Sequence, residues 1–102
     1  MTPAAIWSSE AQADLDEVAL YIGVHEARPV TAERIVREVH ELCNVIASQP
    51  EMGESRPEFG TQCRIYSFKR RWVILYRPAT SGIEVLRFVD GARDYDRLFR
   101  RQ

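Results

Sequence analysis

The spacing of apolar residues changes along the chain near residue 62, and this change limits the folds open to it. Before that point, apolar residues recur every three or four positions, which predicts helices over 9–26 and 29–49 joined by a short link. After it, short runs rich in β-branched and aromatic residues predict strands over 63–69, 71–77 and 83–90. Helices followed by strands favour an α+β fold over a doubly wound parallel sheet.

The remaining segments complete the predicted element order. An apolar run at 4–7 predicts an N-terminal edge strand, and residues 92–101 predict a short C-terminal helix. Turn signals at 69–71 and 78–82 predict that the three later strands pair as an antiparallel meander. We therefore expect a single domain over 1–102 with the order β-α-α-β-β-β-α, in which the meander and the N-terminal strand pack on a helix hairpin.

Details of the first helix and of the central strands can also be predicted. Ser9 and Gln12 fit a capping box at the helix start. The carboxylates of this helix, among them Asp14 and Asp16, are expected to form a solvated face. The last two strands are almost continuously apolar, so we expect them to be central, with the hairpin covering one face and another segment covering the other.

Composition argues against several classes of protein. The chain has no apolar run approaching the ~20 residues of a membrane span and no signal-like N-terminus, so we expect a cytoplasmic protein without a membrane association. Cys43 and Cys63 lack zinc-site spacing and are interpreted as reduced thiols, with a disulfide between them left open. No phosphate loop, nucleophile motif or metal motif is present, and His25 and His40 receive no role. We therefore predict no catalytic residue, cofactor or metal site.

Charge is divided unevenly between the two parts of the chain. Residues 1–62 contain four arginines and eleven acidic residues, whereas residues 63–102 contain ten basic residues and four acidic ones. Two interpretations follow. The halves neutralise each other in the fold, or the basic half meets an acidic partner, which would be nucleic acid or an acidic peptide.

Arginines inside the predicted strands carry the clearest functional signal. Arg64, Arg77 and Arg87 each interrupt an apolar or aromatic run. Each needs a partner or an open face, because burying an unpaired charge is costly. For Arg64 and Arg77 we favour a structural role, such as a pair with an acidic residue of the C-terminal half. For Arg87 and Arg93, which flank the strand-to-helix corner, we favour a functional role in a basic groove on the sheet surface.

The element order and three short patterns resemble the ParE branch of the RelE/ParE superfamily of toxins over nearly the whole chain. The patterns are the loop after the second helix, the run 72–77, and the last strand with its corner. The residues that match are Pro50, Gly53, Arg56, Pro57 and Glu58 in the loop, and Ile83, Val85, Arg87, Gly91, Arg93 and Asp94 at the corner. One departure is Asp90, which stands where the family often has His.

This resemblance implies the toxin of a bacterial type II toxin–antitoxin system, a non-enzymatic poison of DNA gyrase. Its expected partner is a ParD-like antitoxin, with a ribbon-helix-helix N-terminal part that binds DNA and a C-terminal part that wraps the toxin. DNA is then met only through the antitoxin. The alternatives are a RelE-like, ribosome-dependent mRNA endonuclease, an inactive toxin kept as co-repressor, and an unrelated small binding protein. Because Asp90 replaces the corner His, no general base near neutral pH is predicted there, which favours the gyrase interpretation.

Two groups of site residues are expected under this resemblance. Toxicity and target binding are predicted at the C-terminal corner, at Arg87, Asp90, Arg93, Tyr95 and Phe99. Contacts with the antitoxin are predicted at Arg64, Trp72, Arg77, Arg87 and Phe88. Acidic residues of the antitoxin are expected to pair with the arginines of the second group.

Overall fold

The computed structural model describes residues 2–100 and has the mixed α+β architecture expected from the periodicity. Its helices and strands follow the predicted order, with short additions in the loop after the second helix. In chain order they are β1 (Ala4–Trp7), α1 (Ser9–Leu20), a π-helical turn η1 (Tyr21–His25), α2 (Pro29–Ser48), β2 (Glu54–Ser55), a 3-10 turn η2 (Pro57–Phe59), β3 (Arg64–Phe68), β4 (Trp72–Ala79), β5 (Gly82–Asp90) and a 3-10 helix η3 (Tyr95–Arg100).

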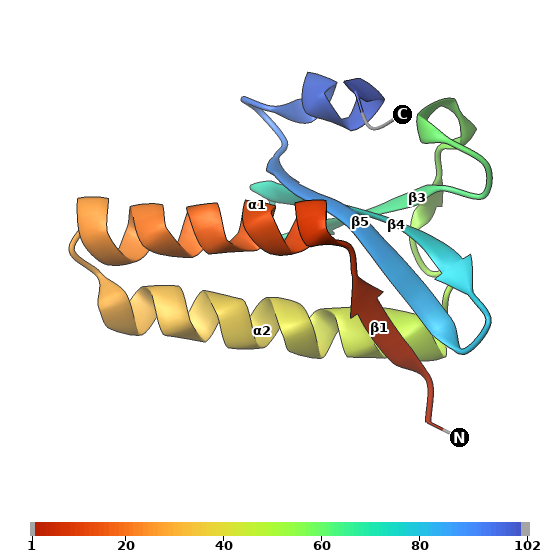
Figure 1. The fold of residues 1–102 in the computed structure, drawn as a ribbon, viewed down its shortest axis with the longest axis horizontal. Helices are drawn as coiled ribbons and strands as arrows, with labels where there is room; N and C mark the ends of the chain where they lie inside the picture. The colour runs from red at the N-terminus through yellow and green to blue at the C-terminus, as the bar shows by residue number, and fades with distance from the viewer. Residues whose placement is uncertain (1, 101–102) are drawn as a thin grey trace.

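Within the described residues the strands form one five-stranded sheet in the order β1-β5-β4-β3-β2 (Figure 1). The predicted meander is confirmed, because β3, β4 and β5 pair antiparallel in sequence order. β1 is an edge strand, as predicted, and pairs parallel to β5. The short strand β2 was not predicted, because its two residues are polar and lie in a Pro/Gly-rich loop.

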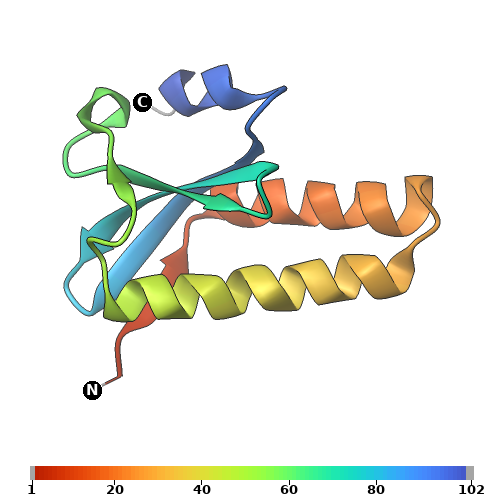
Figure 2. The ribbon, with the colours of Figure 1, turned by 180° about the vertical axis from the view of Figure 1, so that it is seen from behind.

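The sheet separates two apolar cores, which fulfils the expectation that both faces of β4 and β5 are covered. The hairpin of α1 and α2 packs on one face, where Leu15, Val39 and Ile74 are almost completely buried. On the other face, η2 and η3 cover a smaller core that contains Phe59, Leu98 and neighbouring strand residues. Figure 2 shows η2 and η3 on the side of the sheet away from the hairpin. Cys43 and Cys63 lie in different cores as buried thiols.

The start of α1 differs from the predicted capping box. Ser8, not Ser9, is the N-cap, and its Oγ accepts a hydrogen bond from the backbone N–H of Ala11 at 3.0 Å. The Ser8 hydroxyl also donates to the carbonyl of Leu86, and the Ser8 N–H donates to that of Val85. These contacts with β5 are tertiary, so the local sequence pattern did not contain them. The regular part of the helix ends at Leu20, and η1 completes the predicted span to within one residue.

The loop after α2 is fixed to the sheet by the hydroxyl of Tyr76, which is buried. This hydroxyl donates to the carbonyl of Pro50 and accepts from the N–H of Gly53, both at 2.8 Å. A Cβ on Gly53 would lie 2.5 Å from the Tyr76 oxygen and 2.7 Å from the carbonyl oxygen of Ile65. The glycine of the loop pattern is therefore required by close packing.

Candidate functional site

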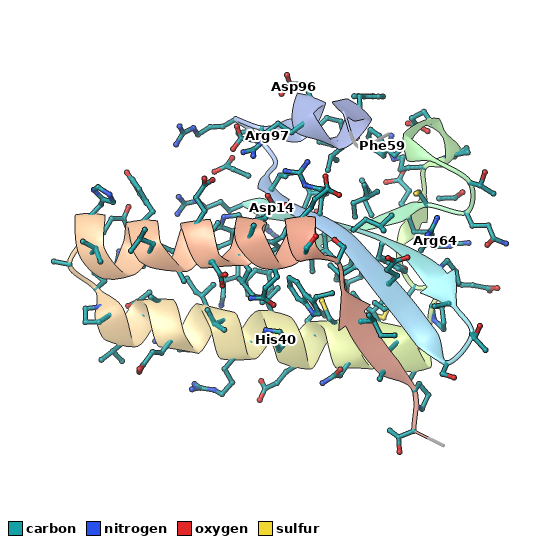
Figure 3. The ribbon with its side chains drawn as sticks, viewed as in Figure 1. Asp14, His40, Phe59, Arg64, Asp96 and Arg97 are labelled. Atoms are coloured by element: carbon teal, nitrogen blue, oxygen red, sulfur yellow. The ribbon has the colours of Figure 1, made fainter. Side chains whose placement is uncertain are left out.

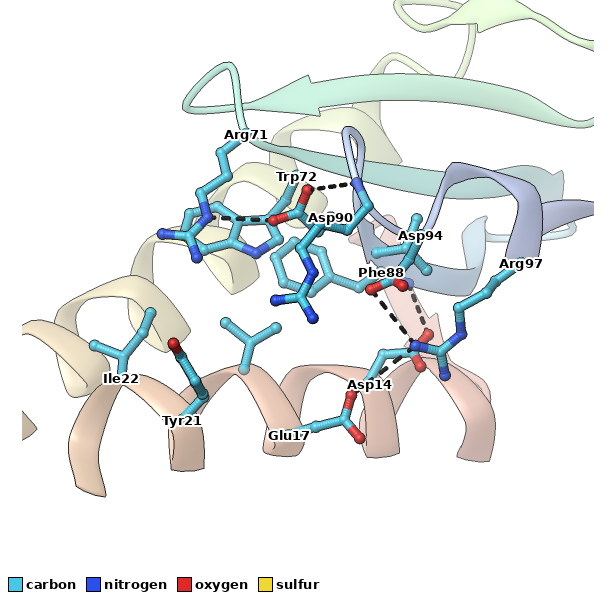
Figure 4. A pocket seen from close by; sticks show the side chains of 13 residues that line it. Asp14, Glu17, Tyr21, Ile22, Arg71, Trp72, Phe88, Asp90, Asp94 and Arg97 are labelled. Carbon is cyan, nitrogen blue, oxygen red and sulfur yellow. Dashed lines mark hydrogen bonds and ion pairs between the residues drawn. The ribbon is translucent and has the colours of Figure 1, made fainter. Parts of the chain in front are cut away.

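A groove opens between α1 and the C-terminal corner of the sheet, with a volume of about 270 Å³. One wall comes from α1 and η1, and the other from the start of β4, the end of β5 and the segment leading into η3 (Figure 4). Trp72 and Phe88 stack in its base with ring centroids 5.9 Å apart. Both rings are almost completely buried, with 4% and 1% of their surface exposed.

Asp90 shapes the turn that leads from β5 to η3. Its Oδ1 accepts hydrogen bonds from the backbone N–H groups of Ala92 at 2.9 Å and Arg93 at 3.1 Å. Arg71 approaches the other oxygen at 3.5 Å. Burial acts to raise the pKa of Asp90, but donation from Arg93, Ala92 and Arg71 outweighs it and lowers that pKa below its ordinary value. Asp90 is therefore held as a carboxylate that organises the corner.

Three arginines of the groove differ in how firmly they are held. The Arg71 guanidinium lies over the Trp72 ring, 4.6 Å from its centroid, in a cation–π contact. Arg97 makes long ion pairs with Asp94 at 3.6 Å and with Glu17 of α1 at 4.0 Å. The Arg93 side chain is exposed, and no hydrogen bond or ion pair fixes it to another described residue. Arg93 is thus the groove cation with the most freedom to meet a ligand.

Arg87 does not line an open basic groove. Its Nε and Nη2 donate to the two carboxylate oxygens of Asp14 at 2.7 and 2.9 Å, and only 8% of each residue is exposed. The hydrogen bonds that Arg87 donates to Asp14 raise the pKa of Arg87, so the guanidinium stays charged inside the protein. The expectation that Asp14 lies on a solvated face is wrong, because α1 turns this carboxylate onto β5. Asp14 is the missing partner of the charge in the strand.

The predicted toxicity residues come from one region but take different roles in it. Asp90 and Arg93 form the corner, and Arg87 lies directly behind it. Tyr95 and Phe99 instead pack their rings against Phe59 of η2, with centroids 5.6 and 4.6 Å apart. Phe99 remains 50% exposed.

The residues predicted to bind the antitoxin do not form one continuous surface. Trp72, Arg87 and Phe88 are buried at the corner, under the helix hairpin, and do not line an open basic groove on the sheet surface. Arg64 and Arg77 lie near the other end of the strands. Arg77 is five positions along β4 from Trp72, a distance of about 17 Å. Figure 3 shows Arg64 on the side of the molecule away from Asp14 and Arg97.

Both distant arginines have structural contacts, as we favoured for them from the sequence. Arg64 donates to the carbonyls of Glu51 and Gly53 at 3.2 and 2.6 Å. Arg77 pairs with Glu84 on the neighbouring strand at 2.9 Å. Both guanidinium groups remain partly or largely accessible to solvent.

Sequence reasoning missed Asp14, Arg71 and Arg97 as parts of the site. Asp14 carries a recognisable signal, since it falls on the apolar stripe of α1 between Ala11 and Leu15. An acidic residue on a buried stripe, together with an arginine in a buried strand, indicates an internal ion pair. Arg71 and Arg97 carry no comparable signal, because their positions in a turn and a short helix depend on the tertiary packing.

Other features of the described residues point to no further chemistry at the corner. His40 packs against Trp7 with ring centroids 4.8 Å apart, and His25 stacks on Tyr21 at the hairpin tip. Across residues 2–100, no group of three or more His, Cys, Asp or Glu side chains is arranged to hold a metal ion. None of the described helices combines the length and the apolar character needed to cross a membrane.

Comparisons with known proteins identify the class to which this fold and corner belong. A chain in the solved structure described as "Chromosomal ParDE TA system from P. aeruginosa" has the same fold, with a TM-score of 0.68 and 22% sequence identity. The alignment covers 87% of this chain and 96% of that chain. No curated protein sequence matches the chain significantly.

The family model for the ParE toxin of the type II toxin-antitoxin system parDE matches residues 5–95. The chain belongs to the ParE toxin family. The resemblance drawn from the loop, strand and corner patterns is thereby confirmed.

Proposed function

We propose that this chain is a growth-inhibiting toxin that poisons DNA gyrase in the cytoplasm, and that it does so by binding rather than as an enzyme. A ParD-like antitoxin neutralises it by direct contact. Membership of the ParE toxin family over residues 5–95 carries this proposal. The exposed Phe99 ring next to the corner supports it, because aromatic side chains are typical anchors of protein–protein interfaces.

In this proposal the toxicity residues divide into contacting and positioning groups. Arg93 and Phe99 are exposed and contact the target. Asp90 fixes the backbone of Arg93, and Tyr95 seats η3 on Phe59. Arg87 is a positioning residue, because it anchors the end of β5 to α1 through Asp14.

The antitoxin meets two separate places on the toxin. Its C-terminal segment lies over the groove between α1 and the corner, where Tyr21 is 45% exposed, and its acidic side chains reach Arg64 and Arg77. Because these places lie about 17 Å apart, the segment spans at least five residues when extended or about eleven when helical. Such a segment orders on binding, with charge pairs selecting the partner.

A gyrase assay with purified chain tests the proposal. The chain is incubated with DNA gyrase, supercoiled plasmid and ATP, with and without the antitoxin encoded beside it, and the plasmid is resolved on a gel. We expect linear plasmid covalently linked to gyrase, and its loss when antitoxin is added. Arg93→Glu should reduce the linear product, while Arg28→Glu, an exposed arginine at the hairpin tip, should not.

Two results would contradict the proposal in different ways. Growth arrest with unchanged plasmid and with messages cleaved at the ribosomal A site would identify an mRNA endonuclease. Unchanged plasmid together with normal growth would identify an inactive toxin that serves as co-repressor.

A further inference from the structure

A second concavity lies beside the groove, between the β3–β4 turn and the corner, with a volume of about 550 Å³. The groove and the concavity share four lining residues, which form the ridge between them: Arg71, Trp72, Asp90 and Arg93. Ser67 and Arg70 line the concavity but not the groove.

Three arginines face this concavity, and one of them, Arg71, pairs with Asp90 at 3.5 Å. Arg70, Arg71 and Arg93 are all exposed, and Asp90 is the acidic residue among the lining groups. The Asp90 carboxylate is already engaged by two backbone N–H groups and by Arg71. In the described part of the chain, the Arg70 and Arg93 side chains have no hydrogen-bond or ion-pair partner.

The backbone holds the cations of the turn apart. Lys69 and Arg70 both have positive φ angles, of 54° and 56°. Lys69 turns toward the hairpin and pairs with Glu38 of α2 at 2.8 Å, whereas Arg70 is left at the concavity. Gly91 closes the other side, since its N–H bonds to the carbonyl of Arg71 and a Cβ there would lie 3.1 Å from Val73. The β3–β4 turn and the corner are thus linked by a hydrogen bond, and their guanidinium groups surround the concavity.

We infer that this concavity binds phosphodiester groups of a nucleic-acid backbone. Guanidinium groups hold phosphate oxygens through charge-assisted hydrogen bonds, and the Ser67 hydroxyl adds a neutral donor. This direct contact differs from the sequence-based expectation that DNA is met only through the antitoxin. The inferred phosphate binding does not depend on whether gyrase is the target, because a chain that does not act on gyrase retains the same surface.

The lining favours phosphate over the acidic side chains of a protein. Protein partners gain most of their affinity from aromatic or aliphatic anchors in well-packed pockets. Here the large apolar lining residues Trp72 and Val73 are only 4% and 8% exposed, and the exposed Ala92 side chain is a single methyl group, so the lining offers little surface to such an anchor. The same burial prevents bases from stacking on Trp72. The contact is therefore electrostatic and independent of nucleotide sequence.

Fluorescence anisotropy tests this inference with the full chain and two labelled probes, a duplex DNA of about 20 base pairs and a single-stranded RNA of about 20 nucleotides. We expect binding at about 50 mM salt that weakens steeply as salt rises. Three neutralised phosphates correspond to a slope of log K against log salt of about −2.7 on duplex DNA and about −2 on a single strand. Binding of the DNA assigns the site to DNA, and binding of the RNA alone assigns it to RNA.

Matched arginine substitutions locate the site. Arg70→Asn and Arg93→Asn should each lower the steepness of the salt slope by about 1. Asparagine suits position 70 because it tolerates a positive φ. Arg28→Asn removes the same charge from the hairpin tip, away from the concavity, and should leave the slope unchanged. Thermal melting should confirm that all three variants remain folded.

Several outcomes would overturn the inference. One is the absence of binding to either probe at about 50 mM salt. Another is an equal loss in Arg28→Asn, which would indicate a diffuse charge effect. A third is binding of a poly-glutamate peptide as tightly as nucleic acid with the same dependence on Arg70, which would indicate an acidic protein partner. Gyrase poisoning is not part of this readout, so the two proposals fail separately.

Discussion

Arg87 on β5 and Asp14 on α1 form a two-pronged ion pair inside the protein, although 73 residues separate them in the sequence. The same Asp14 carboxylate also accepts a hydrogen bond from the backbone N–H of Phe88 at 3.0 Å. One carboxylate therefore satisfies a buried cation and a buried backbone donor. The pair fixes α1 against the end of β5, which sets the width of the groove between them.

Removing the Asp14 carboxylate should destabilise the protein strongly. Asp14→Ala leaves a buried guanidinium without its partner, a change that typically costs about 3–5 kcal/mol. Urea unfolding followed by circular dichroism measures the loss. Asp16→Ala, an exposed acidic residue on the same helix, should change the unfolding free energy by less than about 0.5 kcal/mol.

Removing both charges should be milder than removing one. We expect the double variant Asp14→Ala with Arg87→Met to recover stability relative to Asp14→Ala, because no unpaired charge remains inside. A double variant as unstable as the sum of the two single variants would show that the residues act independently and would contradict this account of the pair.

The two glycines Gly53 and Gly23 should respond in opposite ways to alanine. A Cβ at Gly53 would collide with the Tyr76 hydroxyl and the Ile65 carbonyl, so Gly53→Ala should cost about 1–3 kcal/mol. A Cβ at Gly23 would lie 3.5 Å from the Ala32 Cβ, an ordinary contact within a helical turn. Gly23→Ala should therefore be neutral or stabilising. Equal thermal melting temperatures for the two variants would refute the role given to the Tyr76 contact.

Asp90 should make stability depend on pH in the acidic range. Its pKa is lower in the folded protein than its ordinary value of 3.8, so its ionised form stabilises the fold. That contribution is complete above the ordinary value and is lost as pH falls through the lowered pKa. The difference in unfolding free energy between the protein and Asp90→Asn should therefore narrow from about pH 6 to about pH 3. A difference in unfolding free energy that stays constant over this pH range would show that the Asp90 charge does not contribute to stability.

The Cys43 thiol should be inert in the folded protein. Burial raises the pKa of Cys43 from 9.0 to about 12, so almost no reactive thiolate is present near neutral pH. In a Cys63→Ser background, an aromatic disulfide reagent at about pH 8 should react slowly until urea unfolds the chain. Rapid reaction in native buffer would show that the core around Val39 and Ile46 opens readily.

Local pattern was sufficient for most of the fold. The helices α1 and α2 and the strands β3, β4 and β5 were all predictable, because apolar spacing along each segment reflects which face is buried. The sequence also predicted that a further segment covers the sheet face opposite the hairpin. It did not predict that η2 and η3 share this face. The N-cap at Ser8 was not predictable, since its choice over Ser9 depends on hydrogen bonds to β5.

The candidate site, too, was only partly predictable from local pattern. The corner residues Asp90 and Arg93 were predicted from the sequence, because a charged segment directly after a buried strand is unusual. Their surroundings were not, because the ion-pair partners come from distant segments. Arg87 was expected to be available to a ligand, and it is instead held by Asp14.

The sequence by itself determined which segments become helices and strands, the family of the chain, and the concentration of positive charge in its second part. Only the tertiary structure decided which charges are neutralised and which remain free. Solvation and pairing depend on distances of a few ångströms between segments far apart in the chain, and these distances exist only after the core has packed. Arg87 and Arg93 look alike in the sequence, yet packing buries one with Asp14 and leaves the other at the surface.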